Sequence, residues 1–259
     1  MTFSILVCIK SVIEYAADEA PLLGQRWIDE TERPRGMNLY DAHALEAALA
    51  MRDHDDTVRI TALSAGADGV RATIRRAMAM GADTGVQLAV AEDALLFPER
   101  IAAAIADYAR PQRFDLVLTG AMSEDAMQGI TGPMVAAALG IPCAAAAVAL
   151  RRRPEQGALT VICEMEAGMA ATVRLSGPAL VTVQTGRRVP RYPSLSNTLR
   201  ARRQAIERIA VADVPFPQAA EPLGVAFPAR AADCRILEGS PQQKADALLS
   251  LFNDKGWLR

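Results

Sequence analysis

The sequence is poor in the features that mark several protein classes. Only 5% of its 259 residues are aromatic, two are histidines, and the formal net charge is -2. This balance argues against a dedicated nucleic-acid binder, because such domains usually carry a clear basic excess. The cysteines are scattered without a C-x-x-C pair, so we expect neither a zinc site nor disulfides, but four reduced thiols in or near a core: Cys8, Cys143, Cys163 and Cys234.

Long hydrophobic runs are also missing. The longest, IPCAAAAVAL at residues 141–150, is too short and too rich in alanine to span a bilayer. The opening residues, MTFSILVCIK, lead directly into a strand-like apolar run without a basic leader or a small-residue cleavage site. We therefore expect no membrane insertion and a cytoplasmic location.

What is present is an alternation of strand-like and helix-like stretches. Apolar runs at 3–9, 57–63, 84–90 and 114–119 predict strands, and apolar residues three and four apart predict helices at 41–53, 68–82, 98–110 and 132–140. Gly81 and Gly140 lie where helix C-caps favour glycine. The pattern predicts an α/β fold with a doubly wound, mostly parallel sheet.

The second half of the chain departs from this alternation. ALTVICEMEAG and MAATVRLSG, joined near Gly168, predict an antiparallel hairpin, and PALVTVQT predicts a core strand that returns to the sheet. From residue 186 little periodicity remains until a helix at 240–256, with Ser240 as N-cap and Gly256 as stop. We expect one domain at 1–185, then a long arm over 186–238 and a terminal helix. Arms of this kind usually have a function or dock on a partner.

The predicted sheet suggests a ligand site at the carboxyl ends of its strands. Three loops qualify: one after Cys8, one at Ala65, and the glycine-rich TGAMSEDAMQGITGP at 119–133, which leads into a helix. It is no known phosphate-transfer loop and has no nearby lysine, so static nucleotide binding fits better. A turn that binds nothing is the alternative. Tyr15 and Tyr40 lie on the same edge and could pack on a planar cofactor or cap a core.

No catalytic set can be assembled from the remaining residues. His43 and His54 lie on or beside an amphipathic helix, and Glu124 and Asp125 are adjacent and so face different directions. A chain that binds a nucleotide without catalytic residues is expected to be a carrier or a sensor, not an enzyme.

The basic segment RRVPRYPSLSNTLRARRQAIERI, residues 187–209, contains seven arginines. It could bind nucleic acid, cover part of its own domain, or present a hydrophobic side chain to another protein. The acidic pI, near 5.8, opposes nucleic acid.

Four motifs in order resemble the β subunits of electron transfer flavoproteins. They are LVCIKSVIEYAAD, MNLYDAHALEAAL, ATIRRAMAMGADTGV and RRVPRYPSLSNTLRA, and the tail ILEGSPQQKADALLSLFNDKG is similar to many bacterial members. The resemblance implies an adenine-nucleotide-binding type of α/β sheet in a heterodimer that carries electrons. In such proteins FAD lies mainly on the α subunit at the interface, and the β subunit buries a structural AMP.

By position, the resemblance implies a set of cofactor-binding residues on the same carboxyl-edge loops. Tyr15 and Tyr40 match aromatics that approach the FAD. The AMP site would comprise Cys8, Asn38, Leu39, Tyr40, Asp41, Ala65, Gly120, Ala121, Met122, Ser123, Asp125, Gln128, Gly129, Ile130 and Thr131.

The resemblance also implies partners: an α subunit, on which the terminal arm and helix dock, a flavin-dependent dehydrogenase, and a downstream quinone reductase or other acceptor. Leu195 matches a leucine that inserts into a pocket of the dehydrogenase. The loop would be fixed by Pro190 and Pro193, and flanking arginines would steer toward an acidic surface. The implied partner-binding residues are Pro190, Arg191, Tyr192, Leu195, Arg200 and Arg203.

The sequence also departs from the family pattern. Cys163 and Ala167 change the hairpin, Leu39 replaces a proline, and AMSEDAMQGITG alters the nucleotide loop. The electron-bifurcating branch, with a second FAD in place of AMP, typically has G-D-T-A-Q-V-G in this loop, so we favour AMP. Two alternatives stay open, a bifurcating β subunit with a second FAD and a nucleotide sensor of the universal-stress type.

Overall fold

The structure is a computed structural model that describes residues 2–14, 34–91, 95, 97–153, 157–186, 188–211 and 236–258. The chain forms two compact units. The first comprises residues 1–20 and 30–221, and the second comprises residues 21–29 and 222–259. Each unit is described by itself.

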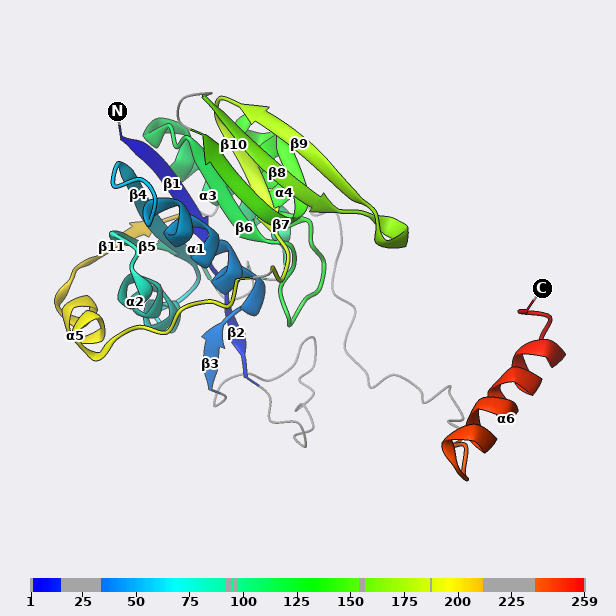
Figure 1. Ribbon diagram of the computed structural model, residues 1–259. Coiled ribbons are helices and arrows are strands. Elements are labelled where there is room, and N and C mark those ends of the chain that lie inside the picture. Colours follow the sequence, from blue (N-terminus) through cyan, green and yellow to red (C-terminus); the bar gives the residue numbers. More distant parts are fainter. Residues whose placement is uncertain are drawn as a thin grey trace. The chain divides into compact units, whose positions relative to one another are not determined.

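A nine-stranded sheet forms the centre of the first unit (Figure 1). Its strands run in the order β11-β5-β4-β1-β6-β10-β7-β8-β9. The six pairings from β11 to β7 are parallel, and β7 pairs antiparallel with β8, as does β8 with β9. The strands are β1 (Phe3–Cys8), β4 (Val58–Ala65), β5 (Thr84–Ala89), β6 (Leu116–Gly120), β7 (Cys143–Arg153), β8 (Ala158–Glu164), β9 (Ala170–Ser176), β10 (Ala179–Val183) and β11 (Ile206–Ala210).

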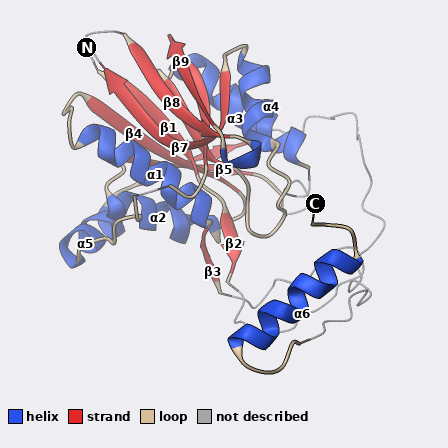
Figure 2. Cartoon of the chain, turned by 45° about the vertical axis from the view of Figure 1, so that its right-hand side comes forward, coloured by secondary structure: helices blue, strands red, loops and turns tan. Residues whose placement is uncertain are grey.

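Helices cover both faces of this sheet (Figure 2). On one face, α1 (Leu39–Arg52) and α2 (Val70–Met80) bury one apolar cluster against the strands, and α5 (Leu195–Arg203) packs on α2. On the other, α3 (Pro98–Gln112) and α4 (Thr131–Leu139) bury a second cluster. Because successive residues of a strand point to opposite faces, the apolar runs feed both clusters, as Leu6 and Val7 illustrate.

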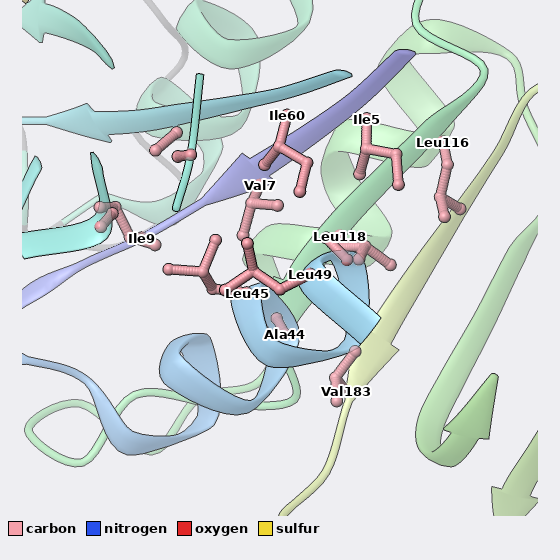
Figure 3. Packing of buried hydrophobic residues seen from close by; sticks show 14 of the residues in the cluster. Ile5, Val7, Ile9, Ala44, Leu45, Leu49, Ile60, Leu116, Leu118 and Val183 are labelled. Atoms are coloured by element: carbon pink, nitrogen blue, oxygen red, sulfur yellow. The ribbon is translucent and has the colours of Figure 1, made fainter. Parts of the chain in front are cut away.

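Helix α1 packs at the centre of the first cluster. Leu45 and Leu49 are fully buried and point toward Val7, Ile60 and Leu118 of the sheet (Figure 3). The burial of each such side chain stabilises the fold by about 1.5 to 3 kcal/mol. The position of α1 is therefore determined by the core, and the polar residues on the same helix are placed with it.

The predicted fold class is confirmed. The four predicted strands and four predicted helices of the first half all exist, with boundaries shifted by one or two residues. Gly81 and Gly140 are C-caps with positive φ, 139° and 69°. The predicted hairpin is β8 and β9, joined by a short 3-10 helix, Glu166–Gly168, and β10 is the returning core strand.

Several elements of the first unit were not predicted. A small antiparallel sheet joins β2 (Ser11–Ile13) to β3 (Arg35–Met37), and strand β7 is formed by the alanine-rich run. The expectation of an arm without regular structure over 186–238 is wrong for 195–210, which form α5 and edge strand β11. The only buried apolar residue of α5 is Ala201, and the only one of β11 is Ile206. The sequence of these two elements therefore has no apolar periodicity that would predict a helix or a strand.

The described part of the second unit contains helix α6 (Pro241–Asp254), which confirms the predicted terminal helix. Ser240 accepts a hydrogen bond from the backbone N–H of Gln243, and the Gln243 side chain accepts one from the backbone of Ser240. Gly256 ends the helix with φ 67°. Among the described residues, no helix is long and apolar enough to cross a membrane.

The three described cysteines are free thiols, and two of them, Cys8 and Cys163, are buried as expected. Cys143, the first residue of β7, is exposed, whereas thiols in or near a core were expected. Cys234 lies outside the described residues.

Candidate functional site

The carboxyl edge of the sheet gathers the predicted site residues. Strand β1 lies between β4 and β6 and runs parallel to both, so Cys8, Ala65 and Gly120 end at the same edge. The loop after β6 then leads into α4, and the loop after β1 leads through β2 and β3 into α1. This is the edge where open parallel sheets bind ligands.

Asn38 joins the start of α1 to the loop after β6. Its side chain is buried, its amide Nδ2 donates to the carbonyl oxygen of Met122 at 2.9 Å, and its Oδ1 accepts from the backbone N–H of Glu124 at 3.1 Å. Asn38 is the N-cap residue of α1 but makes no side-chain cap. Its hydrogen-bonding capacity is used instead to hold residues 122–124 against the helix.

Asp41 joins the same helix to two strand ends. Its carboxylate accepts hydrogen bonds from the backbone N–H groups of Lys10, at 2.7 Å, and Gly120, at 2.8 Å. Burial raises the pKa of Asp41 to about 7, and the donors at Lys10, Asn38 and Gly120 oppose this rise. Burial, together with the nearby Asp41, also raises the pKa of the Cys8 thiol, which is therefore neutral.

Glu124 and Asp125 do face different directions. The Glu124 carboxylate accepts the backbone N–H of Leu39 at 2.9 Å, so it takes the anion position at the N-terminus of α1. Asp125 forms an ion pair with Lys10 at 2.7 Å, and the same ammonium donates to Ser123 Oγ at 3.3 Å. Together these contacts close the loop onto β1 and α1.

The far end of the loop turns into α4. Met127 and Gly129 have positive φ, 51° and 66°, which reverses the chain before Thr131 begins the helix. Helix α4 has no side-chain cap and no acidic residue in its first turn. Its first N–H groups can therefore bind an anion.

Two buried hydroxyl groups near this edge, those of Ser11 and Ser64, lack a hydrogen-bond partner within the described residues. The Ser64 hydroxyl, near the end of β4, is completely buried and has no hydrogen-bond partner in the described part of the chain. Buried hydroxyl groups are almost always satisfied by protein, water or a ligand.

A groove of about 590 Å³ borders the closed loop. The residues that line it include Leu39, Glu124, Asp125, Val189 and Tyr192. This volume lies within the range of small-molecule sites. The loop of residues 120–131 and the 189–203 segment therefore border the same groove.

The structure thus brings together most of the predicted cofactor-binding residues. Cys8, Asn38, Asp41, Gly120, Met122, Ser123 and Asp125 are linked by the contacts above, and Ala121 donates its N–H to Val183 of β10. Leu39 is exposed, Tyr40 is half-buried, and Ala65 ends β4 at the same edge. Gln128, Gly129, Ile130 and Thr131 form the turn into α4. Tyr15 lies outside the described residues.

Sequence reasoning missed three residues that hold this edge together. They are Lys10, Glu124 as a ligand of the α1 N-terminus, and Gln87. Gln87 is fully buried in β5 and donates to the Gly66 carbonyl, which fixes the loop after β4. Of these three residues, only Gln87 could have been noticed in the sequence, as a glutamine within an apolar strand. The Lys10 pair spans 115 positions and leaves no such signal.

The residues predicted to bind a partner lie in the 189–203 segment. Tyr192 and Leu195 are 86% and 77% exposed, and Arg200 and Arg203 are also exposed. Leu195 was expected in a loop. It is instead the first residue of α5, and Ser194 caps this helix. Arg191 differs from Arg200 and Arg203, because its guanidinium pairs with Glu46 of α1 and with Asp53, the residue that follows this helix.

Comparison with known proteins agrees with this arrangement. Residues 26–214 match the electron transfer flavoprotein domain. The chain is 30% identical over 240 residues to the electron transfer flavoprotein subunit beta of Bacillus subtilis, with 90% of this chain and 88% of that protein covered. It is 30% identical over 257 residues to the one from Megasphaera elsdenii (96% and 92% covered) and 32% over 212 residues to the human one (81% and 82%). The chain belongs to the electron transfer flavoprotein family.

Membership in the electron transfer flavoprotein family gives the chain its coarse role, which is electron transfer in association with a flavin. A β subunit also implies an α-subunit partner. The relatives are named as electron transfer proteins and not as enzymes, which confirms that prediction.

Gly120 provides a first test of the site. A Cβ atom at this position would collide with Asp41 Oδ1 and would lie 2.7 Å from Tyr40 Cβ, so Gly120→Ala must displace the start of α1. We expect a loss of about 1 to 3 kcal/mol of stability, together with reduced binding of any nucleotide at this edge. Gly69→Ala is the control, because nothing lies within 4 Å of its added Cβ. Equal denaturation midpoints for the two variants would refute this account of Gly120.

Asp41 provides a second test. Its pKa rises from 3.8 to about 7 on folding, so its contribution to stability is complete below pH 3.8 and is lost as the pH rises through 7. Each pKa unit corresponds to about 1.4 kcal/mol. In Asp41→Asn this dependence should disappear, so the stability of the wild type relative to the variant should fall over that range. Urea unfolding at a series of pH values measures it, and a constant difference would contradict the buried carboxylate.

Proposed function

We propose that this chain is the electron-carrier β subunit of a heterodimer that accepts electrons from flavin dehydrogenases and passes them to a downstream acceptor, such as a quinone reductase. In this proposal AMP is bound in the chain's own carboxyl-edge loops, and the redox FAD lies mainly on the α subunit at the interface. One observation carries the proposal: Asn38 and Asp41 hold the loop of residues 120–131 closed beside a helix N-terminus that no side chain caps.

Of the helix N-termini at this edge, those of α1 and α4 border the loop of residues 120–131, and they suggest where a nucleotide phosphate would bind. Glu124 already occupies the N-terminus of α1, whereas within the described part of the chain no side chain caps α4 at Thr131 and Gly132. A phosphate would therefore bind at α4. The buried Ser64 hydroxyl, without a partner in the described residues, also fits a site that is completed by a ligand.

The loop chemistry supports a nucleotide that is held and not cleaved. Lys10 is already paired with Asp125 and Ser123, which leaves it committed to closing the loop. Electron transfer needs no side-chain acid or base here, because a bound flavin carries the redox chemistry and the protein sets its position and field.

The α subunit would contact the chain in two places. Leu39 and Tyr40 lie at the start of α1, where Leu39 is exposed beside the groove, and these are positions from which the chain would approach the FAD. Helix α6 has no buried residue and carries Leu248, Leu249 and Leu251. A helix of this length gains its stability mainly from packing, which supports its docking on the α subunit as part of the predicted 186–259 region.

The 189–203 segment is proposed as the docking element for the dehydrogenase. Val189, Tyr192 and Leu195 expose apolar surface there. One exposed leucine gives a small anchor of low affinity, which suits a carrier that must leave after each delivery. Arg200 and Arg203 would steer the segment toward an acidic surface. The cytoplasmic location stays a prediction.

Replacement of the leucine tests this proposal. We expect Leu195→Ala to retain the flavin content of the purified heterodimer but to raise, at least tenfold, its apparent KM for reduction by a flavin dehydrogenase. The probe is whichever dehydrogenase, from a purified panel of the source organism, reduces the wild type fastest.

Ile162→Ala is the control for this experiment, because Ile162 is also exposed but lies on β8. Reduction kinetics of Leu195→Ala that match those of the wild type would rule out the 189–203 segment as the docking element.

A further inference from the structure

The backbone of the 189–203 segment, which carries the exposed residues, is held to the rest of the unit by hydrogen bonds. Exposed apolar side chains on a connecting segment would ordinarily sample many positions, and ordering them on binding costs free energy. Here the segment follows the core strand β10 and includes α5, and two arginines, one on the segment and one on α2, fix it to the body.

Arg191 is the first attachment. Its backbone N–H and its Nε donate to Glu46 Oε2 at 3.1 Å and 2.9 Å, and its Nη2 donates to Glu46 Oε1 at 2.9 Å. Two further bonds, at 3.2 Å and 2.6 Å, reach the two oxygens of Asp53. One guanidinium therefore holds two carboxylates in a bidentate manner, a geometry that specifies both distance and orientation.

The carboxylates belong to one face of α1. Glu46 and Asp53 are seven residues apart, which is two helical turns, and so they point to the same side. Glu46 is buried, with its side chain only 7% exposed. A buried carboxylate without a partner would be strongly unfavourable, so Arg191 has one strongly preferred position.

Arg75 is the second attachment. From α2 it donates to the carbonyl oxygens of Ala201, Arg202 and Gln204, at 2.8, 3.1 and 3.2 Å. These are the last carbonyl groups of α5 and the residue after it, which otherwise lack helical partners. Tyr192 and Leu195 thus lie between two fixed points.

We propose that Arg191 is a positioning residue that, with Glu46, holds Tyr192 and Leu195 in the arrangement a partner's apolar pocket accepts, and that it does not itself contact that partner. The inference rests on the proposed docking role of the 189–203 segment. It replaces the expectation that Arg191 binds the partner directly. Preorganisation of this kind raises affinity by lowering the ordering cost of binding.

Glu46 makes the inference testable, because it is too deeply buried to contact a partner. We expect Glu46→Gln and Arg191→Gln each to raise the apparent KM of the heterodimer for the panel dehydrogenase about tenfold, with kcat retained. The double variant should be no worse than Arg191→Gln alone, since Arg191→Gln already removes the pair with Glu46 as well as the pair with Asp53. Arg110→Gln removes an exposed pair with Asp107 on α3 and a hydrogen bond to the Ala138 carbonyl, both away from the 189–203 segment, so it is the control and should leave KM unchanged.

A second readout needs no dehydrogenase. In the intact heterodimer, hydrogen exchange of the amides of residues 189–198 should be faster in Glu46→Gln and Arg191→Gln than in the wild type, and unchanged in Leu195→Ala. Should Glu46→Gln fail to fold, Asp53→Asn, at the more exposed carboxylate, should give a smaller change in the same direction.

Two results would overturn the inference. One is a raised KM in Arg191→Gln with a normal KM in Glu46→Gln, which would mean direct contact. The other is unchanged hydrogen exchange in both variants. A normal KM in Leu195→Ala would instead remove the docking role, while the exchange experiment would still decide whether Arg191 fixes the segment.

Discussion

The buried carboxylate of Asp41 is the interaction on which the carboxyl edge of this protein depends. It accepts hydrogen bonds from the backbone N–H groups of Lys10, after β1, and Gly120, at the end of β6. The neighbouring Asn38 side chain donates to the carbonyl oxygen of Met122 and accepts from the N–H of Glu124. Buried polar groups must be hydrogen-bonded, so these contacts allow the two loops only one mutual arrangement. The loop of residues 120–131 is consequently closed by the protein itself, and a nucleotide would meet a site that is already shaped.

Helix α1 extends this constraint to the surface. Its apolar face is fixed by the core, its first turn holds the loop after β6, and its later turns hold Arg191 through Glu46 and Asp53. One rigid helix thus sets the positions of the proposed cofactor site and of the 189–203 segment. A carrier gains from such an arrangement, because a small exposed anchor can be specific and still dissociate quickly when little order must be acquired on binding.

The sequence predicted those parts of the structure that depend on the apolar pattern within a short stretch of chain. Apolar alternation located β1, β4, β5 and β6, and strand ends located the ligand edge with Cys8, Ala65 and Gly120. It did not reveal β7, whose alanines lack β propensity, or β11, whose main buried residue is Ile206. The pairing of Lys10 with Asp125 and of Arg191 with Glu46 depends on packing between distant segments, so no local pattern could show it.

Measuring the nucleotide content of the heterodimer would show whether the carboxyl-edge loops bind AMP while the flavin is shared with an α subunit. The chain would be co-expressed with its α subunit, the heterodimer purified and denatured, and the released nucleotides quantified by chromatography. We expect one FAD and one AMP for each heterodimer. Two FAD and no AMP would contradict it, because the loop of residues 120–131 would then hold a second flavin.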